Sequence, residues 1–218
     1  WTESIHKQKR VQERKTKYYK MGFASLILIV LLIINGPIIK NIYIDYQNDK
    51  RLIYLYEQLS LISQEKNIFD SNDIQLVKNE DGVILSLSGS SAFPPGSTNL
   101  KDNAKVRIAR YVKIINSFDG YFEINTHTDN AAPPRKFQIK FATNSELAGA
   151  RAATIFSYLI ESGLDFSSGK VKAVFWSDRM PKDFGYLDKM ATDKEIENAN
   201  STQELRAKNR RIDFYFHY

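Results

Sequence analysis

The feature that most constrains this chain is an uncharged, strongly apolar stretch at residues 21–39, bracketed by Lys20 and Lys40. At about 1.5 Å of rise per residue, a helix of this length can cross a hydrocarbon core roughly 30 Å thick. A cleaved signal peptide usually has a shorter apolar region that ends in small residues. The sequence therefore predicts an uncleaved transmembrane helix at 21–39, with Pro37 bending or ending it near its outer end.

Residues 1–20 form a basic tail, in which seven Lys or Arg residues face two Glu residues. Basic residues next to a membrane span stay on the cytoplasmic side. We therefore expect a single-pass protein of the cell inner membrane, with its N-terminus in the cytoplasm and residues 40–218 in the periplasm. Because the chain begins with Trp1, we also expect that further residues precede it.

The composition excludes several classes of site. The 218 residues include no Cys and three His, which rules out disulfides and thiolate ligands and argues against a multi-histidine metal centre. The formal net charge is +6, and the tail supplies five of these charges, so the outer part is nearly neutral. We therefore expect no metal, no cofactor and no nucleic-acid partner.

Residues 40–69 are predicted to form a stalk or linker, mostly as a helix from Tyr43 to Glu65. Leu and Ile recur there among polar residues, and no Pro or Gly interrupts the pattern. The spacing is imperfect for a heptad repeat. Two interpretations stay open: a solvated stalk, or a helix that pairs with a second copy.

Residues 70–218 alternate between strand and helix patterns. An Asp-Gly pair between two apolar runs is a strong signal for a hairpin. The predicted elements are strands at 74–77 and 83–87, a helix at 104–115, a strand at 121–125, a helix at 145–160, and strands at 171–176 and 209–216. The stretch 177–203 is polar and is assigned no element. The pattern predicts an α+β domain, a mixed sheet with helices packed on one face.

Four short motifs, in this order, resemble the OmpA-like peptidoglycan-binding domain in the form that it takes in MotB-type membrane proteins. They lie at 93–100, 127–130, 144–152 and 206–212. The resemblance covers roughly residues 72–218. It implies an OmpA-like fold and binding to the peptide stem of peptidoglycan.

The resemblance also implies that an aspartate after a strand and an arginine in the following helix hold the diaminopimelate residue of that peptide. These are Asp129 and Arg151. A diaminopimelate side chain ends in an ammonium and a carboxylate, which a carboxylate and a guanidinium can satisfy together. The alternatives are a turn carboxylate and a surface cation paired with Glu146 or Glu161. Further predicted residues of this site are Thr128, Asn144, Asn209 and Arg210. Because Arg210 and Arg211 alternate across a strand, at most one of them should face the ligand.

The membrane helix departs from the MotB pattern, in which an aspartate takes up the permeating proton or sodium ion. Ser25 stands in that place, and a hydroxyl does not titrate near neutral pH. Asn35 is the other notable polar side chain of the span. Such groups often bond between membrane helices. We therefore expect an integral-membrane partner subunit, for which the resemblance implies a MotA-like protein, and the resemblance also implies a homodimer.

The leading interpretation is a non-catalytic subunit that anchors a membrane complex to the cell wall. The alternative is a MotB-like stator subunit of an ion-driven motor, in which a MotA-like partner supplies the titratable group or Ser25 and a water molecule bind sodium. A wall-cleaving enzyme is the third class. We predict no enzyme activity, because the sequence offers neither a metal-ligand cluster nor a serine in a nucleophile motif.

Overall fold

The computed structural model describes most of the chain. The described residues are 2–64, 74–133, 135–167, 169–182 and 190–218, without the side chains of 2–11, 27–32, 34 and 137. The chain divides into two compact units, Trp1–Asp49 and Lys50–Tyr218.

Helix α1, Thr2–Ser63, supplies the whole of the first unit and begins the second. Pro37 lies inside this helix, so of the two predicted outcomes, a bend or an end of the helix, the end does not occur. Proline removes one backbone donor, and the turns on both sides keep their own hydrogen bonds. Among the described residues, we find no helix whose length and apolar character suffice for a membrane span. The transmembrane helix predicted at 21–39 falls partly on residues 27–32 and 34, whose side chains lie outside the described part.

The second unit is built on a five-stranded mixed sheet with the strand order β1-β2-β5-β3-β4. The strands are β1 (Ile74–Lys78), β2 (Gly82–Ser88), β3 (Tyr121–His127), β4 (Val171–Ser177) and β5 (Arg211–His217). β3 and β4 are parallel, and the other neighbours are antiparallel. The predicted α+β class with a mixed sheet is thus confirmed, and the last strand of the chain lies at the centre of the sheet.

The turn before β2 depends on Gly82. Its backbone N–H donates to the Asn79 side-chain oxygen at 2.8 Å. A Cβ at this position would lie 2.1 Å from the carbonyl oxygen of Phe216 on β5. Only glycine lets the two strands approach this closely.

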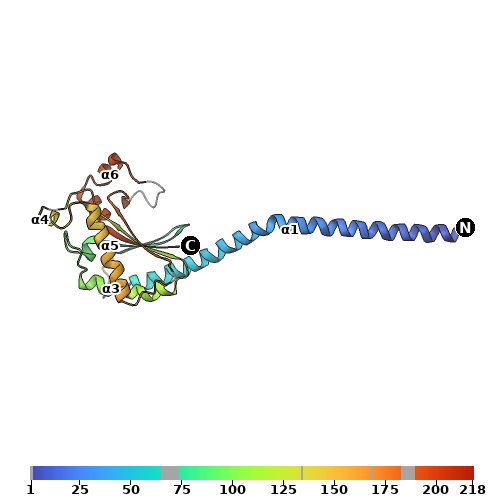
Figure 1. The fold of residues 1–218 in the computed structure, drawn as a ribbon, viewed down its shortest axis with the longest axis horizontal. Helices are drawn as coiled ribbons and strands as arrows, with labels where there is room; N and C mark the ends of the chain where they lie inside the picture. Colours follow the sequence, from blue (N-terminus) through green and yellow to red (C-terminus); the bar gives the residue numbers. More distant parts are fainter. Residues whose placement is uncertain (1, 65–73, 134, 168, 183–189) are drawn as a thin grey trace. The chain divides into compact units, whose positions relative to one another are not determined.

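One face of the sheet carries the hydrophobic core. Helices α3 (Asp102–Ser117) and α5 (Asn144–Glu161) contribute apolar side chains to the same cluster as alternate residues of β2, β3 and β5. Figure 1 shows both helices beside the sheet. Residues of this core with at most 2% exposure include Val83, Leu85, Ile108, Phe122, Ile124, Ile155, Leu159, Ile212, Phe214 and Phe216.

The end of α1 belongs to this core as well. Leu52, Leu55 and Leu59 are 4%, 4% and 0% exposed and lie in the core cluster, whereas Leu61 is 65% exposed. These buried positions form one stripe along the helix. Residues 50–63, which the sequence assigned to a stalk or a self-pairing helix, thus pack within the same compact unit as the sheet.

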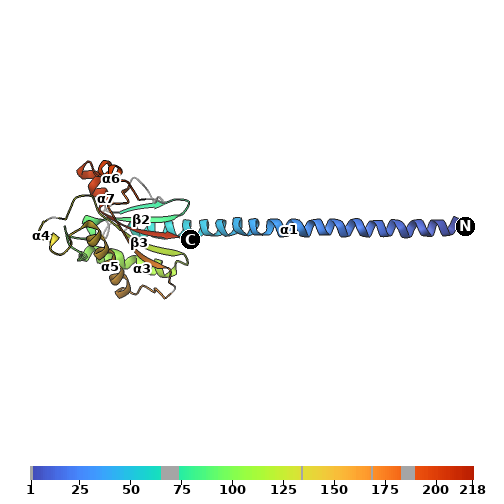
Figure 2. The same ribbon diagram turned by 45° about the horizontal axis from the view of Figure 1, so that its top comes forward.

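The polar stretch between β4 and β5 forms two short helices that the sequence did not predict. α6 (Asp193–Ala199) begins with a capping box of Thr192 and Glu195, and α7 (Gln203–Asn209) is capped by Thr202. Two further short helices are α2 (Gly89–Ala92) and α4 (Arg135–Gln138). In both views α6 lies on one side of the unit and α3 on the other (Figures 1 and 2).

Candidate functional site

The predicted site begins where β3 ends. A register shift between Thr126 and His127 interrupts the pairing with β4, and the Thr128 N–H then donates to the Ser177 carbonyl at 2.9 Å. The Thr128 hydroxyl lies 3.4 Å from the Ser177 hydroxyl. These contacts hold the exit of the strand, so Asp129 emerges at a defined position and is only 7% exposed.

Asn144 fixes the loop that carries Asp129. Its side-chain amide donates to the carbonyl oxygens of Asp129 at 3.0 Å and Ala131 at 2.8 Å. The Ala131 N–H in turn donates to Oδ1 of Asp129 at 3.1 Å. The contacts of Asn144 are therefore with the backbone of the site loop, which it ties to the first turn of α5.

A capping box sets the start of α5. The Thr143 hydroxyl accepts from the Glu146 N–H at 3.2 Å, and the Glu146 carboxylate accepts from the Ala142 N–H at 2.7 Å. Such caps stabilise a helix terminus by about 1 kcal/mol. They also occupy Glu146, so the alternative of a surface pair between Glu146 and Arg151 does not occur.

Arg151 lies in α5 and is 7% exposed. Its Nε donates to the Ser97 carbonyl at 3.0 Å, and its guanidinium lies 4.9 Å from the centre of the Phe93 ring. Burial lowers the pKa of Arg151 to about 10; the Asp129 carboxylate opposes this shift and Arg210 adds to it. The side chain stays positively charged at neutral pH. Phe93 and Ser97 lie in the motif at 93–100 but were not predicted as site residues.

Arg210 completes the charged group from the far end of the chain. It lies between α7 and β5, and its guanidinium forms an ion pair with Oδ2 of Asp129. The next residue, Arg211, is the first of β5 and donates from Nε to Asp213 at 2.8 Å. The two neighbouring guanidiniums therefore have different partners.

Asn209 has a different role from its neighbour. It is 3% exposed, accepts from the Lys182 N–H at 2.8 Å and donates to Ala199 and Asn200 at 2.9 and 3.0 Å. Its amide joins the segment before α7 to the chain after β4. Asn209 thus supports the backbone beside Arg210, and its polar atoms are already engaged.

A buried polar group lies behind the site. His127 Nδ1 is 3.1 Å from the Met180 carbonyl, and Nε2 is 3.3 Å from Asp213. Burial lowers the pKa of His127, and the nearby Arg211 charge acts in the same direction. Burial alone would raise the pKa of Asp213, but Arg211 and then His127 hold it well below its usual range. With side-chain exposures of 1% and 2%, His127 and Asp213 are inaccessible to a substrate and act structurally.

The structure therefore brings Asp129, Arg151 and Arg210 into one electrostatic group, with one carboxylate and two guanidiniums. No second hydrogen bond or ion pair joins Arg151 to the described residues besides the one to Ser97, so its terminal nitrogens remain open to a ligand. Such a group suits a ligand that carries carboxylates and an ammonium. Within the described residues, no cluster of three His, Asp or Glu residues could hold a metal ion.

The two predicted membrane positions lie on α1, ten residues apart in the sequence. The Ser25 hydroxyl donates to the Met21 carbonyl at 2.9 Å, one helical turn earlier. This is the usual way in which a helix satisfies a serine hydroxyl. The side chain of Asn35 is exposed in this chain.

Comparison with known proteins agrees with this fold. Residues 92–189 match the OmpA family. A MotB-like protein from Desulfovibrio vulgaris shares the fold with a TM-score of 0.60 and 17% identity, over 80% of this chain and 98% of that chain. The cell wall anchor of the T6SS from Pseudomonas aeruginosa has a TM-score of 0.52 and 21% identity, over 67% of this chain and 89% of that chain. No curated protein sequence matches the chain.

Proposed function

Since residues 92–189 form a domain of the OmpA family, we propose that this chain is a non-catalytic subunit that anchors a membrane complex to the cell wall. The observation that carries the proposal is the convergence of Asp129, Arg151 and Arg210 from three distant parts of the sequence. The ligand is the diaminopimelate-containing peptide of peptidoglycan.

Each charged group has a distinct task in this proposal. Arg151, held by Phe93 and Ser97, offers its terminal nitrogens to a ligand carboxylate. The Asp129 carboxylate accepts hydrogen bonds from the ligand ammonium. The ammonium thereby replaces part of the ion pair that Arg210 forms with Asp129 in the free protein. Arg210 stays close enough to bind a second carboxylate. Charge-assisted hydrogen bonds of this kind are about twice as strong as neutral ones.

The proposal assigns membrane anchoring and partner binding to the N-terminal part of the chain. Residues 21–39 are the inner-membrane anchor, the basic tail lies in the cytoplasm, and the OmpA family domain lies in the periplasm. The helix associates with an integral-membrane partner, and two copies of the chain form a dimer. The Pseudomonas aeruginosa protein with this fold is a cell wall anchor, which is consistent with the proposed role.

The test is binding of the fragment Lys50–Tyr218 to purified sacculi. The fragment starts at Lys50 because the α1 leucines are part of its core. Asp129→Asn and Arg151→Gln are compared with wild type and with Arg135→Gln, which removes an exposed arginine from α4. Loss of one charge-assisted contact, worth about 1.5–3 kcal/mol, should weaken binding roughly 10- to 100-fold. Arg135→Gln should bind like wild type.

Sacculi with lysine in place of diaminopimelate test the ligand itself. Lysine lacks the side-chain carboxylate that Arg151 is proposed to bind, so wild type should bind these sacculi as weakly as Arg151→Gln binds the diaminopimelate type. Thermal melts of each variant establish that it is folded. A folded wild type that binds neither type of sacculus would overturn wall anchoring, and equal binding to both would overturn the diaminopimelate assignment.

A MotB-like stator subunit is the second candidate, and the shared fold with a MotB-like protein favours it. Ser25 is then the residue to test, because its hydroxyl oxygen keeps lone pairs for sodium while it donates to Met21. Ser25→Ala should abolish sodium flux of the complex with its membrane partner if this function holds. If the wild type binds the wall but its complex carries no sodium flux, the stator function is refuted and the wall-anchoring function stands.

A further inference from the structure

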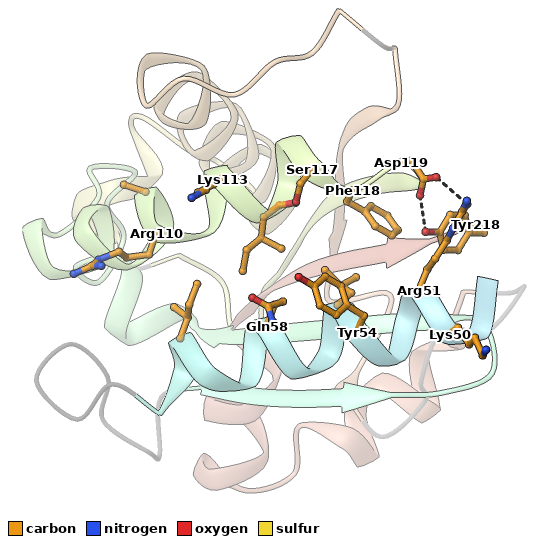
Figure 3. Close-up of a pocket in the computed structure, with 14 residues that line it drawn as sticks. Lys50, Arg51, Tyr54, Gln58, Arg110, Lys113, Ser117, Phe118, Asp119 and Tyr218 are labelled. Carbon is orange, nitrogen blue, oxygen red and sulfur yellow. Dashed lines mark hydrogen bonds and ion pairs between the residues drawn. The ribbon is translucent and has the colours of Figure 1, made fainter. Parts of the chain in front are cut away.

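A second binding surface lies within the unit Lys50–Tyr218, away from the charged site. The end of α1 and the second half of α3 enclose a cleft of about 1000 Å³, which Figure 3 shows. None of the residues of the charged site lines it. The cleft is large enough for a small organic ligand or part of a larger one.

The floor and the rim of the cleft differ in character. The floor is apolar and includes Leu55 and Ile62 from α1 and Ile114 and Phe118 from the other wall. Four basic side chains lie around it: Lys50, Arg51, Arg110 and Lys113, of which the first two come from α1 and the others from α3 (Figure 3). Asp119 is the single acidic residue among the described residues of the lining.

That one carboxylate is already neutralised. Asp119 lies 2.8 Å from the Arg51 guanidinium and accepts from the Tyr218 hydroxyl at 2.6 Å. Arg51 also lies 5.8 Å from the centre of the Tyr218 ring. Lys113, by contrast, has no hydrogen bond or ion pair to any residue that the structure describes, and it lines the opposite wall. Among the described residues of the lining, basic side chains therefore outnumber acidic ones, and the floor is apolar.

We propose that this cleft binds the headgroup of an anionic phospholipid, with the phosphate at Lys113 and the glycerol and first methylenes on the apolar floor. The proposal rests on the membrane anchor of the proposed function, which determines the source of the anion. Lys40, at the predicted end of the span, and Lys50 are ten positions apart in the sequence. Such a segment reaches at most about 35 Å, so the cleft stays near the membrane surface and meets phospholipid at high effective concentration.

The absence of Cys makes a direct test possible, because any introduced thiol is unique. The full chain is placed in lipid nanodiscs as Ser117→Cys, inside the cleft, or as Ser157→Cys, an exposed position on α5 outside it. Labelling by an uncharged maleimide is timed in discs of phosphatidylcholine and in discs that also contain phosphatidylglycerol. Phosphatidylglycerol should slow labelling at Ser117→Cys about threefold or more and leave Ser157→Cys unchanged.

Charge variants show whether the protection depends on the cleft. Lys113→Glu in the Ser117→Cys background should remove the protection, whereas Lys105→Glu, on the same helix but outside the cleft, should keep it. High salt should weaken the protection, because it screens exposed charges. Inorganic phosphate added to phosphatidylcholine discs should not reproduce it, since it cannot occupy the apolar floor.

The other outcomes overturn the proposal in distinguishable ways. Labelling of Ser117→Cys that is slower than that of Ser157→Cys by the same factor in both kinds of disc would mean an acidic protein segment or a second copy in the cleft. Protection by inorganic phosphate would mean a free-anion site. Labelling of Ser117→Cys that is as fast as that of Ser157→Cys in both kinds of disc would mean that no lipid binds. A chain that fails to enter the discs would overturn the membrane anchor, while binding to sacculi would still report separately on the wall-binding domain.

Discussion

The buried stripe on α1 makes a sharp prediction about where the folded domain begins. Leu59 is 0% exposed and lies in the core cluster, and Leu61, two residues later on the same helix, is 65% exposed. Replacing each by Ala makes the same chemical change in the same helix. Any difference between the two variants therefore reports burial.

The expected magnitude follows from that contrast. Removing a fully buried leucine side chain costs its transfer free energy plus a term for the cavity, in all about 2–5 kcal/mol. Leu61→Ala should change the free energy of unfolding by less than about 0.5 kcal/mol, because it removes an exposed side chain. For a domain of this size, a loss of about 3 kcal/mol lowers the melting temperature by roughly 6–12 °C.

The assay is urea unfolding of the fragment Lys50–Tyr218, followed by circular dichroism and checked by a thermal melt. A fragment that starts at residue 70 should unfold at lower urea than the longer one, because it lacks Leu52, Leu55 and Leu59. If Leu59→Ala and Leu61→Ala have equal, small effects, the end of α1 does not pack on the domain and the stalk interpretation is right.

Three further predictions concern the rest of the domain. Asp213→Asn should cost about 3–5 kcal/mol in urea unfolding, because it leaves the Arg211 charge buried without its carboxylate; a loss below about 1 kcal/mol would contradict this. The free energy of unfolding should fall as pH drops below about 6.5, since the pKa of His127 is lowered by folding and the unfolded chain takes up the proton first. Melts from pH 7.5 to 5 should show a flatter profile in His127→Gln. Gly82→Ala should cost about 1–3 kcal/mol, because its Cβ would lie 2.1 Å from the Phe216 carbonyl; unchanged hydrogen-exchange protection in β2 would argue against that contact.

Much of the fold could be predicted from local patterns. Alternating apolar residues placed the strands, and the Asp81-Gly82 turn placed the first hairpin close to where β1 and β2 pair. Helices α3 and α5 follow from their 3.6-residue periodicity. The short helices α6 and α7 were missed, although the Thr192 and Glu195 capping box was a readable signal. That stretch is polar, and hydrophobic periodicity does not predict helices that are stabilised mainly by their caps.

The site was only partly predictable. Asp129 and Arg151 were predicted through the resemblance, and the structure gives both a buried and electrostatically linked position. Asn209 was expected to shape or contact the site, and its amide is engaged by the chain around it. Phe93 and Ser97, which hold Arg151, lie in the motif at 93–100, but that motif did not predict their contacts with Arg151. The Phe93 ring and the Ser97 carbonyl become part of the candidate site only because the fold places them next to Arg151.

The sequence by itself determined the segments of this protein: an apolar stretch behind a basic tail, a helix with a leucine stripe, and an α+β domain. These depend on spacing within one segment, which side-chain periodicity records directly. Only the tertiary structure decided which segments meet. The leucine stripe could have faced solvent, a second copy or the sheet, and Asp129 meets Arg210 across 81 residues of chain. Such contacts depend on closing long loops around a shared core, and no local pattern specifies the partner.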